Sequence, residues 1–178
     1  MKKTSPAYDI PKAAPPGPLR LVQQFVNSVD LENKVDWLGE RWFAEHGLPG
    51  EEDLATAREA REVLRTLLTV NNGQPLEPSA IETLNRISAG VGLAVRFDDL
   101  GGAALEPLGQ RPLGAILGAV YTAMAGGSWN RLKACRNCCW AFHDYSKNRS
   151  ATWCSMRLCG NRLKTRAYRS RQAKRPSG

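Results

Sequence analysis

The sequence predicts a mainly α-helical protein with one small β-hairpin, followed at its C-terminal end by a zinc finger. Between residues 19 and 126, apolar side chains recur at helical spacing in five separate segments. Around the glycine-containing turn at 98–102, the pattern changes to that of two short strands. All five cysteines lie between residues 135 and 159. We therefore expect three regions: a flexible lead over 1–18, a helical domain over 19–130 and a finger over 131–178.

The overall composition excludes several classes of protein. A hydrophobic share of 42% is enough for a real core, which argues against general disorder. No segment approaches the roughly 18 uninterrupted apolar residues of a membrane span. The lead contains five prolines and no apolar run, so it does not resemble a secretory signal. We therefore expect a cytoplasmic protein whose thiols are reduced.

The first three predicted helices occupy the segment from residue 19 to residue 70. The first runs over 19–30, where apolar residues recur at helical spacing. The second spans 35–46 and is closed by Gly47. The third begins in the acidic stretch 51–53, which suits a helix N-terminus, and ends at the Asn-Asn-Gly sequence 71–73.

The rest of the helical domain contains two more helices and the hairpin. Pro78 begins the fourth helix, because proline is tolerated in the first turn. Residues 93–97 and 103–105 flank the Asp-Asp-Leu-Gly-Gly turn at 98–102 and are predicted to pair as a β-hairpin. The fifth helix runs over 112–126 and is rich in small residues.

The helical domain offers no nucleophile–base pair and no metal triad, so we do not expect an enzyme. His46 lies beside Gly47 at a helix end, where a contact with the helix dipole or a carbonyl is expected instead of catalysis. Asn27 follows an apolar run and is expected to cap the helix or form a turn. The alternative is that Asn27 lines a ligand pocket.

The cysteine spacing points to a structural zinc site. Two pairs, Cys135-x2-Cys138 and Cys154-x4-Cys159, can supply the four thiolates that tetrahedral zinc prefers. An odd number of cysteines in a cytosolic protein disfavours disulfides. Iron is the alternative metal, since the same thiolates can hold it. Cys138 is preferred over Cys139 as the second ligand because the x2 spacing forms a tight turn.

The segments around the cysteines complete the predicted finger. Trp140, Phe142 and Trp153 are expected to wrap the metal on a short hairpin between the two cysteine pairs, because so small a module cannot bury enough surface alone. Ser155 is placed to cap a final helix over 156–173.

The finger carries nearly all of the excess positive charge. Residues 131–178 contain 13 Lys and Arg and one acid, Asp144, whereas residues 1–130 contain 12 basic and 16 acidic residues. Like charges along one helix destabilise it unless a polyanion neutralises them, and a nucleic-acid backbone is the obvious partner. An anionic membrane is disfavoured because the helix lacks large apolar residues. The predicted nucleic-acid contacts are Lys147, Arg149, Arg162, Lys164, Arg166, Arg169 and Arg171.

Three segments of the sequence resemble known protein families. Residues 153–162, Trp-Cys-Ser-Met-Arg-Leu-Cys-Gly-Asn-Arg, closely resemble the bacterial CGNR-type zinc finger, and residues 140–146 are similar to the same family. Residues 20–130 resemble the ABATE domain that precedes this finger, notably at Phe-Val-Asn-Ser 25–28. The resemblance implies a treble-clef-like finger in a transcriptional regulator, whose upstream domain senses a ligand or dimerises.

The leading functional hypothesis is therefore a zinc-dependent regulator that binds double-stranded DNA. Because one finger rarely gives useful specificity, we expect a homodimer formed through the helical domain. A small-molecule effector bound to that domain is the second expected partner. Two alternatives stay open: an RNA-associated protein that uses the same basic helix, and a small-molecule-binding protein with a purely structural finger.

Overall fold

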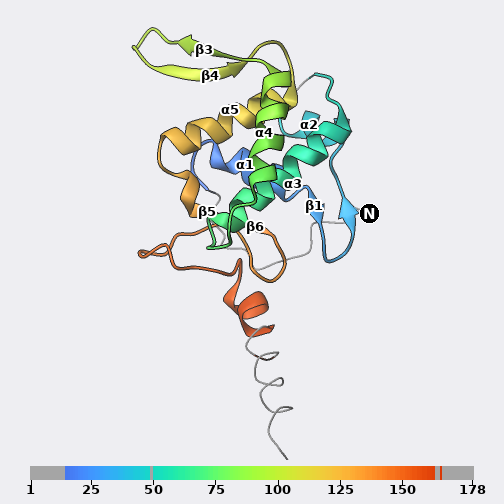
Figure 1. Ribbon diagram of the computed structural model, residues 1–178, viewed down its shortest axis with the longest axis vertical. Coiled ribbons are helices and arrows are strands. Elements are labelled where there is room, and N and C mark those ends of the chain that lie inside the picture. Colours follow the sequence, from blue (N-terminus) through green and yellow to red (C-terminus); the bar gives the residue numbers. More distant parts are fainter. Residues whose placement is uncertain (1–14, 49, 163–164, 166–178) are drawn as a thin grey trace, which may run out of the picture.

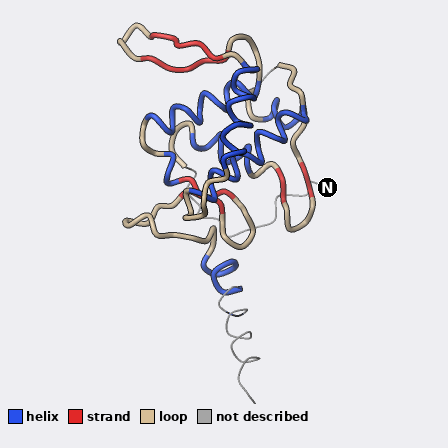
Figure 2. Tube along the Cα trace, in the orientation of Figure 1, coloured by secondary structure: helices blue, strands red, loops and turns tan. Residues whose placement is uncertain are grey.

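The computed structural model describes residues 15–48, 50–162 and 165, and it is mainly helical (Figures 1 and 2). Three two-stranded antiparallel sheets accompany the helices in the described chain. The α-helices of this part are α1 (Leu19–Val26), α2 (Glu40–Glu45), α3 (Leu54–Val70), α4 (Pro78–Val91) and α5 (Pro112–Ala125). The paired strands are β1 (Val29–Asp30) with β2 (Val35–Asp36), β3 (Leu93–Phe97) with β4 (Ala103–Pro107), and β5 (Leu132–Ala134) with β6 (Ala141–His143).

The predicted helix over 19–30 was too long, because α1 ends at Val26 and the chain then forms β1. Asp30 explains the change, since its carboxylate accepts hydrogen bonds from the N–H groups of Glu32 and Asn33, both at 3.0 Å. Lys34 then takes a φ of 55°, which reverses the chain toward β2. Side-chain hydrogen bonds to the backbone here compete successfully with helix formation.

The start of the second predicted helix was also wrong, because residues 35 and 36 belong to β2 and α2 begins at Glu40. Asp36 accepts from the Leu38 N–H at 3.0 Å and forms a bidentate ion pair with Arg61 of α3, at 2.7 and 3.0 Å. These bonds fix Asp36 in an extended conformation that a helix would not allow.

Helix α3 lies at the centre of the molecule and was predicted well. The Asp53 side chain caps it by accepting from the Ala55 and Thr56 N–H groups, at 3.3 and 3.0 Å. Leu64 and Leu68 of α3 are fully buried. They pack in one apolar core with residues of α1, α4 and α5.

The hairpin of β3 and β4 forms as predicted and projects beyond the helices (Figure 1). It is anchored by α5, where glycines allow a close approach. A Cβ at Gly114 would lie 2.5 Å from the Pro107 side chain, and a Cβ at Gly118 would lie 2.8 Å from the Leu105 carbonyl oxygen. The small residues of α5 therefore serve to dock β4 against the helix.

The finger begins with β5 and β6, and its hairpin differs from the predicted one. The expected hairpin lay between the two cysteine pairs, but β6 pairs with Leu132–Ala134, which precede the first cysteine. Leu132, Ala134 and Ala141 are buried in the same core as the helices. No helix in the described part of the chain is both long and apolar enough to cross a membrane.

Candidate metal centre and its basic surroundings

The first cysteine pair lies on the tight turn that joins β5 to β6. The Cys139 N–H donates to the Cys135 carbonyl, and the Cys135 N–H donates to the Trp140 carbonyl, each at 2.9 Å. Cys139 takes a φ of 60°, in the left-handed region that closes such a turn. From α3, Arg65 donates to the Cys139 carbonyl at 2.9 Å and holds the turn from the helical domain.

The second pair, Cys154 and Cys159, is positioned by a single π-helical turn at Met156–Gly160 (η2). Ser155 caps this turn as predicted: its hydroxyl accepts from the Leu158 N–H at 3.3 Å, and its carbonyl accepts from the Cys159 N–H at 3.0 Å. The chain is helical at residues 161 and 162, and the remainder of the predicted helix over 156–173 lies outside the described residues, apart from residue 165.

The sulfur atoms of Cys135, Cys138, Cys154 and Cys159 all lie within 4.8 Å of one another. The three distances among the sulfurs of Cys138, Cys154 and Cys159 are each 3.6 Å. Disulfides require about 2.05 Å between sulfurs, so these thiols are not bonded to one another. Four sulfurs at about 2.3 Å from zinc in a tetrahedron are about 3.8 Å apart, so the observed spacing fits a zinc ion.

The electrostatics of the clustered thiols also favour a bound cation. Hydrogen bonds from the Cys138 and Cys154 thiols lower the pKa of Cys135 well below its ordinary range. Hydrogen bonding to Cys135 and Cys138 raises the pKa of the Cys154 thiol. A dication bound among the four sulfurs would favour the thiolate form of each of them.

The apolar side chains around the cluster match the prediction for a small metal module. Trp140 and Phe142 are buried in a second apolar cluster together with Cys135, Cys154 and Cys159, and Trp153 packs against it. Cys139 is not among the clustered thiols, and burial raises the pKa of its thiol.

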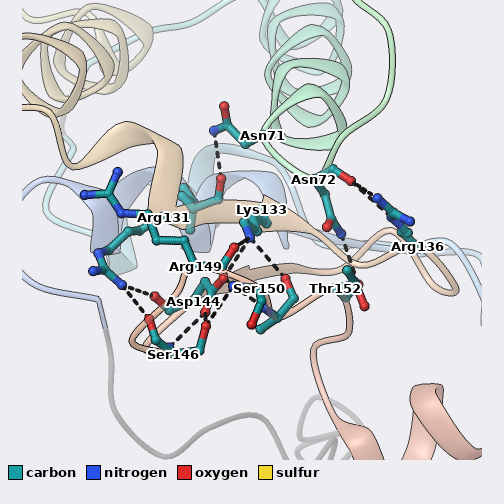
Figure 3. Close-up of polar contacts among 12 residues, drawn as sticks. Asn71, Asn72, Arg131, Lys133, Arg136, Asp144, Ser146, Arg149, Ser150 and Thr152 are labelled. Atoms are coloured by element: carbon teal, nitrogen blue, oxygen red, sulfur yellow. Dashed lines mark hydrogen bonds and ion pairs between the residues drawn. The ribbon is translucent and has the colours of Figure 1, made fainter.

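A buried ion pair organises the loop that follows β6 (Figure 3). The Lys133 ammonium donates to the Asp144 carboxylate at 2.7 Å and to the Arg149 carbonyl at 2.6 Å. Asp144 is fully buried, and it also accepts from the Ser146 hydroxyl at 2.6 Å and from the Ala151 N–H at 3.0 Å. Burial raises the pKa of Asp144, but the hydrogen bonds from Lys133 and Ser146 outweigh it and place the pKa below its usual value.

Asn27 joins α1 to β6. Its side-chain amide donates to the Ala141 carbonyl at 2.9 Å and accepts from the Ala141 N–H at 2.7 Å. Gln23 donates to the same carbonyl at 3.1 Å. Asn27 is also the C-cap of α1, so the predicted capping role is confirmed, and its amide replaces a neighbouring strand at the edge of β6.

Two asparagines at the end of α3 bind the finger from the other side (Figure 3). Asn71 donates to the Leu132 carbonyl at 2.8 Å, and Asn72 donates to the carbonyls of Ala134 and Thr152, at 2.8 and 3.0 Å. Arg136 returns a hydrogen bond to the Asn72 carbonyl at 3.0 Å. In the sequence this Asn-Asn pair indicates only a helix stop, because contacts with residues more than 50 positions away leave no local signal.

The predicted nucleic-acid residues fall into two groups. Lys147 and Arg149 are exposed on the loop after β6, and Arg162 is exposed after η2, where it forms an ion pair with Glu32 at 2.8 Å. Lys164, Arg166, Arg169 and Arg171 lie outside the described residues. Arg157 is a further exposed basic residue on η2, which the sequence analysis did not single out.

Comparison with protein families agrees with the arrangement of the two parts. Residues 131–172 match the family model of the CGNR zinc finger. Residues 19–127 match the ABATE model, described as "Putative stress-induced transcription regulator". No curated protein matches the chain. The matched segments confirm the resemblance found in the sequence, and together with the clustered thiols they show that the chain belongs to the ABATE family and carries a C-terminal CGNR zinc finger.

Proposed function

We propose that this protein is a zinc-dependent transcription regulator that binds double-stranded DNA through the basic surface of its finger. Cys135, Cys138, Cys154 and Cys159 hold one structural zinc ion in this proposal. The fit of the sulfur spacing to a zinc tetrahedron supports this ligand set. When bound, the ion supplies no reaction and fixes the two cysteine-bearing turns relative to each other.

The proposal rests on the buried position of the finger's one acidic side chain. Asp144 is the sole Asp or Glu between residues 131 and 178, and it is fully buried against Lys133. The outer surface of the finger therefore presents basic side chains without carboxylates from its own segment. Such a one-signed surface is typical of proteins that bind a polyanion.

The loop after β6 is the best-defined part of this surface. The Asp144 carboxylate and the Lys133 ammonium fix its backbone from inside, so that Lys147 and Arg149 are presented on an ordered turn. Arg149 takes a φ of 51°, and its carbonyl is bound by Lys133. We propose that Lys147, Arg149 and Arg162 contact phosphates together with Lys164, Arg166, Arg169 and Arg171.

The helical domain supplies dimerisation in this proposal, because one finger covers too few base pairs for useful specificity. An effector that binds the helical domain is the other role expected from the sequence. The description of the matched family, a transcription regulator, supports a binding protein and not an enzyme.

The proposal is tested by measuring duplex DNA binding at several salt concentrations. With these seven phosphate contacts, the slope of log affinity against log salt should be about −6. The double variant Lys147→Ala/Arg149→Ala should make that slope shallower by about 2, because each phosphate contact contributes about 0.9.

The matched control removes the same charge far from the finger. Arg41→Ala/Arg86→Ala deletes two exposed arginines of α2 and α4 and should leave the slope unchanged. DNA affinity that does not respond to salt, or an equal change for both double variants, would exclude the proposed surface. A structured RNA that displaces duplex DNA at equal length would replace the DNA proposal with the RNA alternative.

A further inference from the structure

The two edges of the β3–β4 hairpin differ in what their backbone groups face. In the hairpin, the Leu108 N–H donates to the Gly92 carbonyl and the Asp98 N–H donates to the Gly102 carbonyl, each at 3.0 Å. Both bonds join even-numbered residues, and hydrogen-bonded pairs alternate with non-bonded pairs along an antiparallel ladder. In the register between these two bonds, the even-numbered residues are therefore the ones that bond across the hairpin. The N–H and C=O groups of the odd-numbered residues therefore point outward, away from the partner strand.

The outer edge of β4 is covered. Figure 1 shows β4 between β3 and α5, and the Leu105 carbonyl oxygen would lie 2.8 Å from a Cβ at Gly118 of α5. Pro107 occupies the next outward-facing position and has no N–H to offer. An additional strand therefore cannot pair along β4.

The outer edge of β3 faces away from the helices. Within the described residues, no backbone hydrogen bond reaches the outward N–H groups of Val95 and Phe97. The side chains there are apolar and exposed, with 57% of Val95 and 79% of Phe97 accessible to solvent. An open edge strand with apolar, exposed side chains is a ready template for pairing with another strand, and natural proteins normally block such edges.

We propose that β3 pairs with β3 of a second copy of this chain, which joins the two hairpins into one four-stranded antiparallel sheet. The inference rests on the homodimer proposed above and names its surface, but it requires no nucleic acid. In the symmetric register, Val95 lies opposite Val95 of the second copy, and Phe97 lies opposite Leu93. All of these residues present outward backbone groups, so each such pair exchanges hydrogen bonds.

Charge and closure both favour a second copy as the occupant of this edge. In the same register Arg96 lies opposite Ala94 of the second copy, so no like charges meet, and Arg96 keeps its own ion pair with Glu106 at 3.3 Å. Because β4 is covered by α5, each hairpin has one open edge, and pairing stops at two chains instead of continuing into a filament.

The two-fold axis at Val95 allows a charge-exchange test with the full chain. Wild type, Val95→Lys and Val95→Glu are studied separately by sedimentation velocity, after nuclease treatment and at moderate ionic strength, because high salt would screen the introduced charges. Wild type should reach twice the 19.6 kDa chain mass as its concentration rises. Each variant alone should self-associate about tenfold more weakly or worse, because two like charges then face each other directly on neighbouring strands.

An equimolar mixture of the two variants should restore the dimer, since lysine then faces glutamate. This restoration also shows that both variants are folded. Leu76→Glu, at an exposed leucine before α4, is the control and should dimerise as wild type does. The proposal is overturned if wild type stays monomeric at all concentrations, if both single variants still dimerise, or if the mixture stays monomeric. DNA binding by a monomeric wild type would leave the proposed DNA-binding function standing and would reject the homodimer together with this surface.

Discussion

Replacing Arg65 with methionine should weaken zinc binding, although Arg65 lies on α3 in the helical domain. Its buried guanidinium donates to the Cys139 carbonyl at 2.9 Å and to the Val26 carbonyl at 2.6 Å. Methionine keeps most of the apolar stem of the side chain and removes both donors, together with the Nε–H that binds the Glu62 carboxylate at 3.0 Å. Two backbone carbonyls then lose a charged hydrogen-bond partner.

The expected loss of zinc affinity comes from only one of these two hydrogen bonds, the one that supports the metal-binding turn. A hydrogen bond from a charged donor contributes about 1.5–3 kcal/mol. The bond to Val26 holds the end of α1, so its loss lowers the free energy of unfolding with or without zinc. The bond to Cys139 holds the turn that bears Cys135 and Cys138. Losing about 1.5 kcal/mol there corresponds to roughly tenfold in zinc affinity, within the 10–100-fold typical of groups that support metal ligands.

The assay is competition for zinc with a chromophoric chelator at fixed pH, with Arg61→Met as the matched control. Arg61 lies one helical turn earlier on α3 and is also buried, but its hydrogen-bond partners, Asp36, Ser28 and Glu62, all belong to the helical domain. Arg61→Met should therefore lower stability and leave zinc affinity within about twofold. Equal zinc affinities for the two variants would refute the assigned role of Arg65.

Three further predictions concern the ion pairs and the thiols. Asp144→Asn leaves the buried Lys133 charge unpaired and should lower the free energy of unfolding of the zinc-loaded chain by about 3 kcal/mol, which lowers the midpoint by about 6–12 °C in calorimetry; a change below about 1 kcal/mol would contradict the pairing. Cys138→Ser should abolish stoichiometric zinc in elemental analysis while Cys139→Ser retains it, and the reverse result would exchange their roles. Burial raises the pKa of Asp36, but hydrogen bonds from Arg61 outweigh it and hold the pKa below its usual value. The Asp36 contribution is therefore full above the unfolded pKa of about 3.9 and is lost as pH falls through the lower folded value. In urea titrations, the stability gap between wild type and Asp36→Asn should stay constant from about pH 7 to 5 and shrink below about pH 4, and a gap that widened on acidification would oppose this.

The elements that the sequence predicted best are those whose local pattern and packing agree. Helices α3, α4 and α5 each bury one apolar face against the common core, so helical spacing was sufficient to place them. The β3–β4 hairpin was equally predictable from the sequence, because the turn at 98–102 separates two short apolar segments. Cysteine spacing likewise predicted four thiols that the fold brings together.

The end of α1 and the start of α2 could not be predicted from periodicity, because Val29 and Val35 fit the helical spacing as well as they fit strands. The outcome depends on Asp30, which binds the backbone of the turn after β1, and on Asp36, which binds Arg61 on α3. The second of these contacts joins residues 25 positions apart. A single sequence does not reveal such partners, so tertiary contacts override the local pattern here.

The contacts between finger and helical domain imply that the two parts stabilise each other. A zinc module of this size has little apolar surface of its own, and here Leu132, Ala134 and Ala141 extend the helical core into the finger. Asn27 holds β6 from α1, while Arg65 holds the metal-bearing turn from α3. A shift of either helix must therefore alter the geometry of the thiols. The coupling is reciprocal, so that zinc binding, which fixes those thiols, strengthens the same contacts by an equal free energy.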